Sequence, residues 1–159
     1  MKQRPLLVFA LSFLALTLPL AWAWFAWGSD LYTRFLIDLL DALGLRMRQR
    51  AHGSAAAPRF ISVVPFLVLM LVTPRLGWKR RVFGAVGGLA VLVAVHCGLL
   101  LVVDAATAAY GRGAESVEKF FPFVILADGV PLLLWLVLAR EFLAEVIPGL
   151  GEKPPGAGA

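Results

Sequence analysis

The chain has 159 residues, of which 60% are hydrophobic and 16% are charged, and its formal net charge is +5. Soluble domains have roughly 45–50% apolar and about 25% charged residues, so this composition excludes an ordinary soluble domain. Most of the positive charge flanks long apolar runs, which favours anionic lipid headgroups over nucleic acid as its partner. The single cysteine excludes an intrachain disulfide, and the sequence contains no zinc-binding spacing.

The first apolar run covers residues 5–27 and follows a short basic leader at residues 2–4. A basic leader, an apolar stretch and the small-residue pattern at 21–23 are also features of a cleaved signal peptide. The run continues to Trp27, however, and closely spaced tryptophans are typical of the aromatic belt at a membrane interface. We therefore predict a retained transmembrane helix, kinked at Pro19.

Residues 29–45 predict an amphipathic helix that lies in the membrane interface. Its charged residues repeat at spacings of four, four and three, which places them along one face; they are Asp30, Arg34, Asp38 and Asp41. Leucines and a phenylalanine fill much of the remaining surface, as in interfacial helices. The alternative is that this helix packs on the other helices as a lid. A basic cluster follows, formed by Arg46, Arg48 and Arg50, and it is suited to anionic lipid or an acidic partner.

The second run, residues 59–75, is short for a span, because about 20 apolar residues are needed to cross the hydrocarbon core. It can cross if Arg59 and Arg75 extend their charged ends outward. Residues 74–81 form a tight turn with four positive charges. A short basic loop between spans is typical of the cytoplasmic side, so four spans place both termini in the cytoplasm. We expect the cell inner membrane as the location.

The third run, residues 82–103, contains the two most distinctive patterns of the chain. Gly84 and Gly88 form a small-residue face that allows another helix to approach closely. The same run holds His96 beside Cys97. A titratable side chain within a span is costly, so His96 requires a partner or a function.

The fourth run, residues 120–140, holds the polar residue Asp128. At ~1.5 Å per residue, His96 and Asp128 both lie roughly 10–12 Å below the same interface. We therefore predict an intramembrane polar pair between His96 and Asp128. Its simplest role is a hydrogen bond that joins two helices.

The whole pattern predicts an all-α polytopic membrane protein with four transmembrane helices plus one interfacial amphipathic helix. These elements form a single domain over residues 1–148. The tail at 149–159 is rich in glycine and proline and is expected to be disordered. We expect no cofactor and no metal. The expected partners are the lipid bilayer and other membrane proteins.

The arrangement of runs and turns resembles the exosortase and archaeosortase neighbourhood, and in particular the small exosortase H-associated membrane proteins. The residues that carry the resemblance lie within 60–143, namely Pro65-Phe66-Leu67, the basic stretch 75–81, His96-Cys97-Gly98 with Asp104, and Phe121-Pro122. Exosortases use a cysteine, an arginine and a histidine from separate helices. No second region here offers a matching cysteine context, so the resemblance implies an accessory role in envelope protein sorting and no transpeptidase activity.

Three functional hypotheses follow. The first is a non-enzymatic membrane accessory protein or subunit, which binds partners through its glycine face and its amphipathic segment. The second is a small membrane-embedded thiol enzyme that uses Cys97, His96 and an arginine such as Arg59. Adjacent residues on a helix point about 100° apart, so Cys97 and His96 do not form a catalytic pair by themselves. The third is a proton-coupled transporter subunit that uses Asp128 and His96.

Overall fold

The computed structural model describes residues 4–45, 60–74, 76–111 and 114–146, and over these ranges it is helical with no strand. The elements in chain order are α1 (Arg4–Ala23), the π-helical segment η1 (Trp24–Gly28), α2 (Ser29–Ala42), α3 (Val63–Val72), α4 (Trp78–Tyr110), α5 (Ala114–Leu138) and α6 (Arg140–Val146). The predicted tail at 149–159 lies outside the described residues.

Within the described residues, three helices are long and apolar enough to cross a membrane, namely Leu7–Ala42, Trp78–Tyr110 and Phe121–Leu138. The second apolar run of the sequence forms only the ten-residue helix α3. At ~1.5 Å per residue, α3 is about 15 Å long, which is half of a ~30 Å hydrocarbon core. The protein is therefore an all-α membrane protein whose described residues form three helices of spanning length and one shorter apolar helix.

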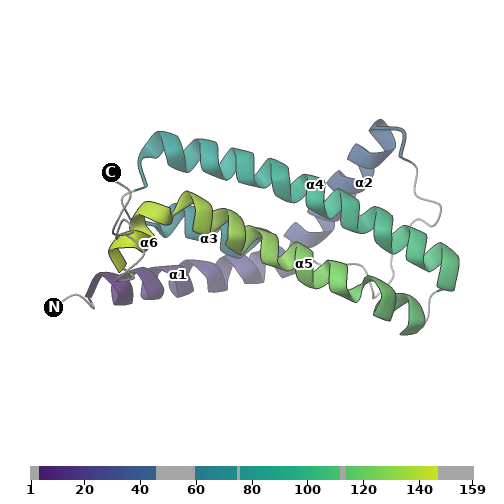
Figure 1. The fold of residues 1–159 in the computed structure, drawn as a ribbon, viewed down its shortest axis with the longest axis horizontal. Helices are drawn as coiled ribbons and strands as arrows, with labels where there is room; N and C mark the ends of the chain where they lie inside the picture. Colours follow the sequence, from purple (N-terminus) through teal and green to yellow (C-terminus); the bar gives the residue numbers. More distant parts are fainter. Residues whose placement is uncertain (1–3, 46–59, 75, 112–113, 147–159) are drawn as a thin grey trace, which may run out of the picture.

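The first span and the amphipathic segment form one continuous helix, although the sequence suggests a break near Gly28. Gly28 and Ser29 both have right-handed helical dihedral angles, and no side chain caps the start of α2. The joint is the π-helical turn η1, a wider turn that changes the direction of a helix. Figure 1 shows α2 leaving the line of α1 and crossing α4.

The long helices α4 and α5 run side by side in opposite directions, and α3 occupies one half of the bundle. The start of α1, the junction between α3 and α4, and α6 all lie at the same end of the molecule (Figure 1). Ring contacts close this end, where Phe9 of α1 lies 5.2 Å from Phe142 of α6 and 6.3 Å from Trp135 of α5.

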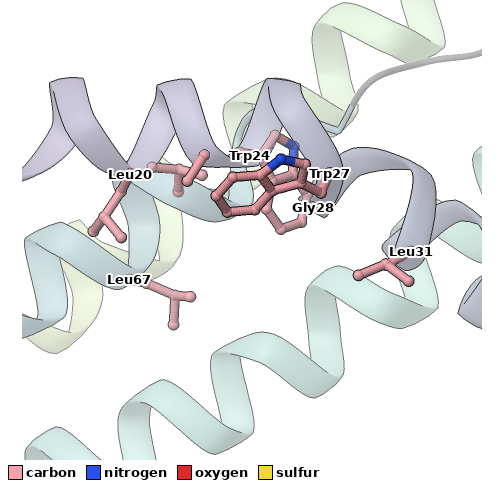
Figure 2. Close-up of a pocket in the computed structure, with 8 residues that line it drawn as sticks. Leu20, Trp24, Trp27, Gly28, Leu31 and Leu67 are labelled. Carbon is pink, nitrogen blue, oxygen red and sulfur yellow. The ribbon is translucent and has the colours of Figure 1, made fainter.

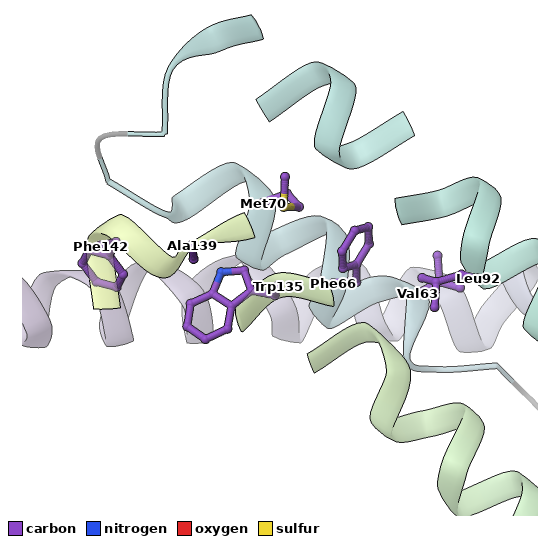
Figure 3. Close-up of a cluster of buried hydrophobic side chains, with 7 residues drawn as sticks. All are labelled: Val63, Phe66, Met70, Leu92, Trp135, Ala139 and Phe142. Carbon is purple, nitrogen blue, oxygen red and sulfur yellow. The ribbon is translucent and has the colours of Figure 1, made fainter. Parts of the chain in front are cut away.

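Helix α3 is short, but it is the most completely buried element of the bundle. Phe66, Val68 and Met70 are at most 1% exposed. The buried cluster around α3 draws on α4, α5 and α6 as well, and Figure 3 shows its members: Val63, Phe66, Met70, Leu92, Trp135, Ala139 and Phe142.

Gly84 and Gly88 of α4 face this cluster. A Cβ atom added at Gly88 would lie 2.2 Å from Cζ of Phe66, and one added at Gly84 would lie 2.7 Å from Cε of Met70. The small-residue face is thus occupied by α3 of the same chain. The sequence suggested that a partner protein would bind through this face, but in the structure the face is not free.

Thr73 joins three helices at the end where α3 meets α4. The indole nitrogen of Trp135 on α5 donates to the Thr73 hydroxyl at 2.8 Å, and the hydroxyl donates to the carbonyl of Leu69. Arg81 of α4 donates to the Thr73 carbonyl at 3.0 Å. Because Thr73 is fully buried, these bonds hold the turn in one geometry.

Arg80, one residue before Arg81, forms an ion pair at the surface of the same end. Its guanidinium lies 2.6 Å from the Glu141 carboxylate of α6. This hydrogen bond, together with the charge of Arg80, holds the pKa of the Glu141 carboxyl below its ordinary value. The pair is exposed to solvent, so we assign it a role in positioning α6 and little stability.

We expect Gly88→Ala to destabilise the protein, because the added methyl group overlaps the Phe66 ring. Overpacking of this kind costs about 1–3 kcal/mol. The matched control is Gly87→Ala, since a Cβ atom at Gly87 meets nothing within 4 Å. Thermal unfolding of both variants in detergent micelles measures the difference. Equal midpoints for the two variants would show that α3 does not pack closely on α4.

We also expect Thr73→Val to cost about 1–3 kcal/mol of unfolding free energy, because it leaves the buried indole nitrogen of Trp135 without an acceptor. Thr107→Val is the control, because the Thr107 hydroxyl donates only to a carbonyl of its own helix, that of Val103. In a double-mutant cycle, Trp135→Phe should cost less in the Thr73→Val background than in the wild type. Additive costs would contradict the proposed role of this bond.

Candidate functional site

His96 lies in the interior of the bundle, enclosed by aromatic rings from separate segments. Its side chain is fully buried. The Phe60 ring, just before α3, lies 4.4 Å from the imidazole, and the Tyr32 ring of α2 lies 5.7 Å from it, edge to face. The Trp24 ring of η1 in turn lies 5.4 Å from Tyr32. Apolar rings therefore replace water around most of this imidazole.

Tyr32 also supplies the one polar contact of His96 that the described residues show. Its hydroxyl lies 3.0 Å from Nδ1 of His96, and the two groups share a hydrogen bond between α2 and α4. Tyr32 is not among the site residues predicted from the sequence. The signal was present, because Tyr32, Leu36 and Leu40 follow one another at a spacing of four and so share the buried face of α2.

Phe60 adopts an unusual backbone conformation at this site. Its φ angle is +42°, in the left-handed region that residues other than glycine rarely occupy. Such a conformation costs about 1–3 kcal/mol and persists only when surrounding contacts enforce it. The Phe60 ring is packed against both His96 and Tyr32, and these contacts supply the constraint.

The predicted pair of His96 with Asp128 is not a direct hydrogen bond. Nδ1 of His96 is bonded to Tyr32, and Nε2 has no hydrogen-bond partner among the described residues. Asp128 is exposed on α5, yet it lines the same cavity as His96. The two residues thus line one cavity from different helices, with no hydrogen bond between them.

Cys97 does not join this polar centre. Its partly buried side chain packs against the second apolar cluster of the bundle, which contains Leu36, Leu40, Phe60, Leu99, Leu100 and Ala127. Arg59, the arginine considered for a thiol mechanism, lies outside the described residues. Asp104 is partly buried two helical turns beyond His96 on α4. The described part of the chain contains no group of three or more His, Cys, Asp or Glu residues that could hold a metal ion.

Helix α2 has two contrasting faces. Leu36 and Leu40 are at most 1% exposed and pack against α4 residues such as Leu99. Another face carries what we term the acidic stripe, four exposed side chains with a net charge of −2: Asp30, Arg34, Asp38 and Asp41. The cluster Arg46, Arg48 and Arg50, which follows α2 in sequence, lies outside the described residues.

An apolar groove of about 260 Å³ lies where η1 bends the first helix away from α3. Figure 2 shows Trp24 and Trp27 at this bend, with Leu67 of α3 on the opposite side. Gly28 belongs to the same turn, and a Cβ atom there would lie 2.9 Å from the Trp24 indole. The groove wall is almost entirely carbon, so it can accept an apolar chain but supplies no acid, base or nucleophile.

No protein-family model matches this sequence, and neither a curated protein nor a solved structure does so.

Proposed function

We propose that this chain is a non-enzymatic accessory subunit of a membrane complex, and that the acidic stripe of α2 docks a basic segment of its partner. The observation that supports the proposal is the division of α2 into a face buried on α4 and an exposed charged face. The buried face fixes the helix to the bundle. The exposed face then presents a rigid pattern of charge.

The chemistry of the stripe selects the partner. Three carboxylates and one guanidinium leave a net negative surface, which attracts lysine and arginine side chains and is repelled by anionic lipid headgroups. The helix Leu7–Ala42 has 36 residues, or about 54 Å, so it is longer than the ~30 Å hydrocarbon core. We therefore assign α2 to the membrane interface, where a basic segment that borders a partner's span can reach it.

The other parts of the proposal concern topology. Lys79 and Arg80 are exposed at the end of the molecule that holds the start of α1 and α6. Following the positive-inside rule, we assign this end and both termini to the cytoplasm and the protein to the inner membrane. We assign α3 as a fourth membrane-embedded helix that rises from this end to about mid-depth. On the sequence resemblance, we assign the complex to envelope protein sorting.

Reversing the charge of the stripe tests the docking role. With a photo-crosslinking residue at Arg34 in native membranes, we expect a crosslinked partner peptide that is rich in lysine or arginine and borders an apolar segment. Asp38→Lys combined with Asp41→Lys should lower partner affinity about tenfold, which corresponds to about 1.4 kcal/mol. The control is Glu118→Lys, a charge reversal at an exposed residue of α5.

Two results would overturn the docking role. One is unchanged partner binding after the double reversal, and the other is a crosslinked peptide without basic residues. A lower unfolding temperature with unchanged partner binding would show that the stripe is covered within its own chain.

The thiol-enzyme hypothesis is tested separately, with Cys97→Ala. Because Cys97 packs against apolar side chains, we expect the variant to keep full assembly with the partner and full function in cells, with a small loss of stability. A complementation assay in a strain that lacks the gene measures this outcome. Loss of function in a folded, assembled Cys97→Ala protein would favour a thiol mechanism over an accessory role.

A further inference from the structure

A cavity between α4 and α5 is lined by His96, whose Nε2 is a buried polar atom without a hydrogen-bond partner among the described residues. Its volume is about 90 Å³, well above the ~10–15 Å³ that a water molecule needs. Five of its seven lining residues are apolar, namely Phe60, Ile61, Leu99, Val124 and Ala127. The other two are His96 and Asp128.

Nε2 of His96 is the buried group in this cavity that lacks a hydrogen-bond partner. The imidazole is fully buried, Nδ1 is bonded to Tyr32, and Nε2 has no partner among the described residues. A buried polar atom left unpaired costs about 1–3 kcal/mol. An apolar occupant of the cavity would leave that cost in place, whereas a hydrogen-bonding molecule would remove it.

Asp128 supplies the second polar contact. Asp128 is an exposed residue of α5 and lines the same cavity as the buried imidazole. A molecule placed between them can donate hydrogen bonds both to Nε2 and to the carboxylate. Water has this capacity and fits the volume, and a buried water typically makes two to four such bonds.

We propose that this cavity binds water, which bridges Nε2 of His96 and the carboxylate of Asp128. In the bridge, Nδ1–H of His96 donates to the Tyr32 hydroxyl, and Nε2 accepts from the water. The bridge links α2, α4 and α5 through one polar network, Tyr32–His96–water–Asp128. It stands independently of the docking role of α2.

Among the titratable side chains of the elements packed around His96, Tyr32 on α2 bonds to the imidazole, Cys97 is its neighbour on α4, Asp104 lies two turns further along α4, and Asp128 is on α5; α3 carries none. Asp128 alone among these lines the cavity together with His96.

Magnetic resonance of ¹⁵N-histidine in the full chain, reconstituted in lipid nanodiscs, tests the proposal. The chain has two histidines, so a His52→Gln background leaves His96 as the single signal. At neutral pH we expect an imidazole protonated at Nδ1, with an unprotonated Nε2 that shows magnetisation transfer from water. A proton on Nε2, or the absence of water transfer to it, would overturn the proposal.

A cavity-filling variant tests the location of the water. Ala127 is buried in the cavity wall, and Ala127→Leu should abolish water transfer to Nε2 while the Nδ1 signal of the Tyr32 bond remains. Gly129→Ala is the control, because a Cβ atom there meets nothing within 4 Å, and it should leave the transfer unchanged. If Ala127→Leu does not fold, the smaller Ala127→Val replaces it. Unchanged transfer in a folded filling variant would place the water elsewhere and refute the site.

Discussion

The close approach of α3 to α4 is the constraint on which the rest of this bundle depends. In a bilayer, helices gain no hydrophobic free energy by leaving lipid, so their association rests on close packing and polar contacts. Gly88 allows the Phe66 ring to lie directly against the backbone of α4. Helix α3 has only ten residues, and it also packs against α1 and α5, so its short length is offset by contacts on several sides.

The shortness of α3 creates the polar centre. Because α3 begins at Val63, the described residues place no further helix beside α4 and α5 in the half of the bundle beyond it, apart from α2. α2 crosses that half, and Tyr32 and Phe60 close around His96. The imidazole therefore lies at the boundary between the half of the bundle that contains α3 and the half that contains the cavity. The same contacts fix α2, the helix to which we assign partner docking.

The two ends of the molecule thus have different characters. At one end, hydrogen bonds to Thr73 and the Arg80–Glu141 pair fasten the turn between α3 and α4 to α5 and α6. At the other, α2 is held on α4 by leucines and carries its charges outward. A fixed basic end and an exposed acidic helix suit a protein that orients itself in the membrane and binds another chain there.

The sequence by itself determined the class of this protein, because apolar runs of spanning length are the signature of membrane helices. It also identified the glycine face, the basic turn and the amphipathic pattern of α2, since each depends on residue type and local spacing. Only the tertiary structure decided which residues of the chain contact one another. In the structure, Gly88 packs against Phe66 of the same chain. The second apolar run forms a helix of only half the spanning length, and the first span continues into α2 without a break. His96 bonds to Tyr32, where depth alone had suggested Asp128. Depth along a helix places two residues at one level, but the rotation and crossing of helices decide which side chains meet, and those follow from packing over the whole bundle.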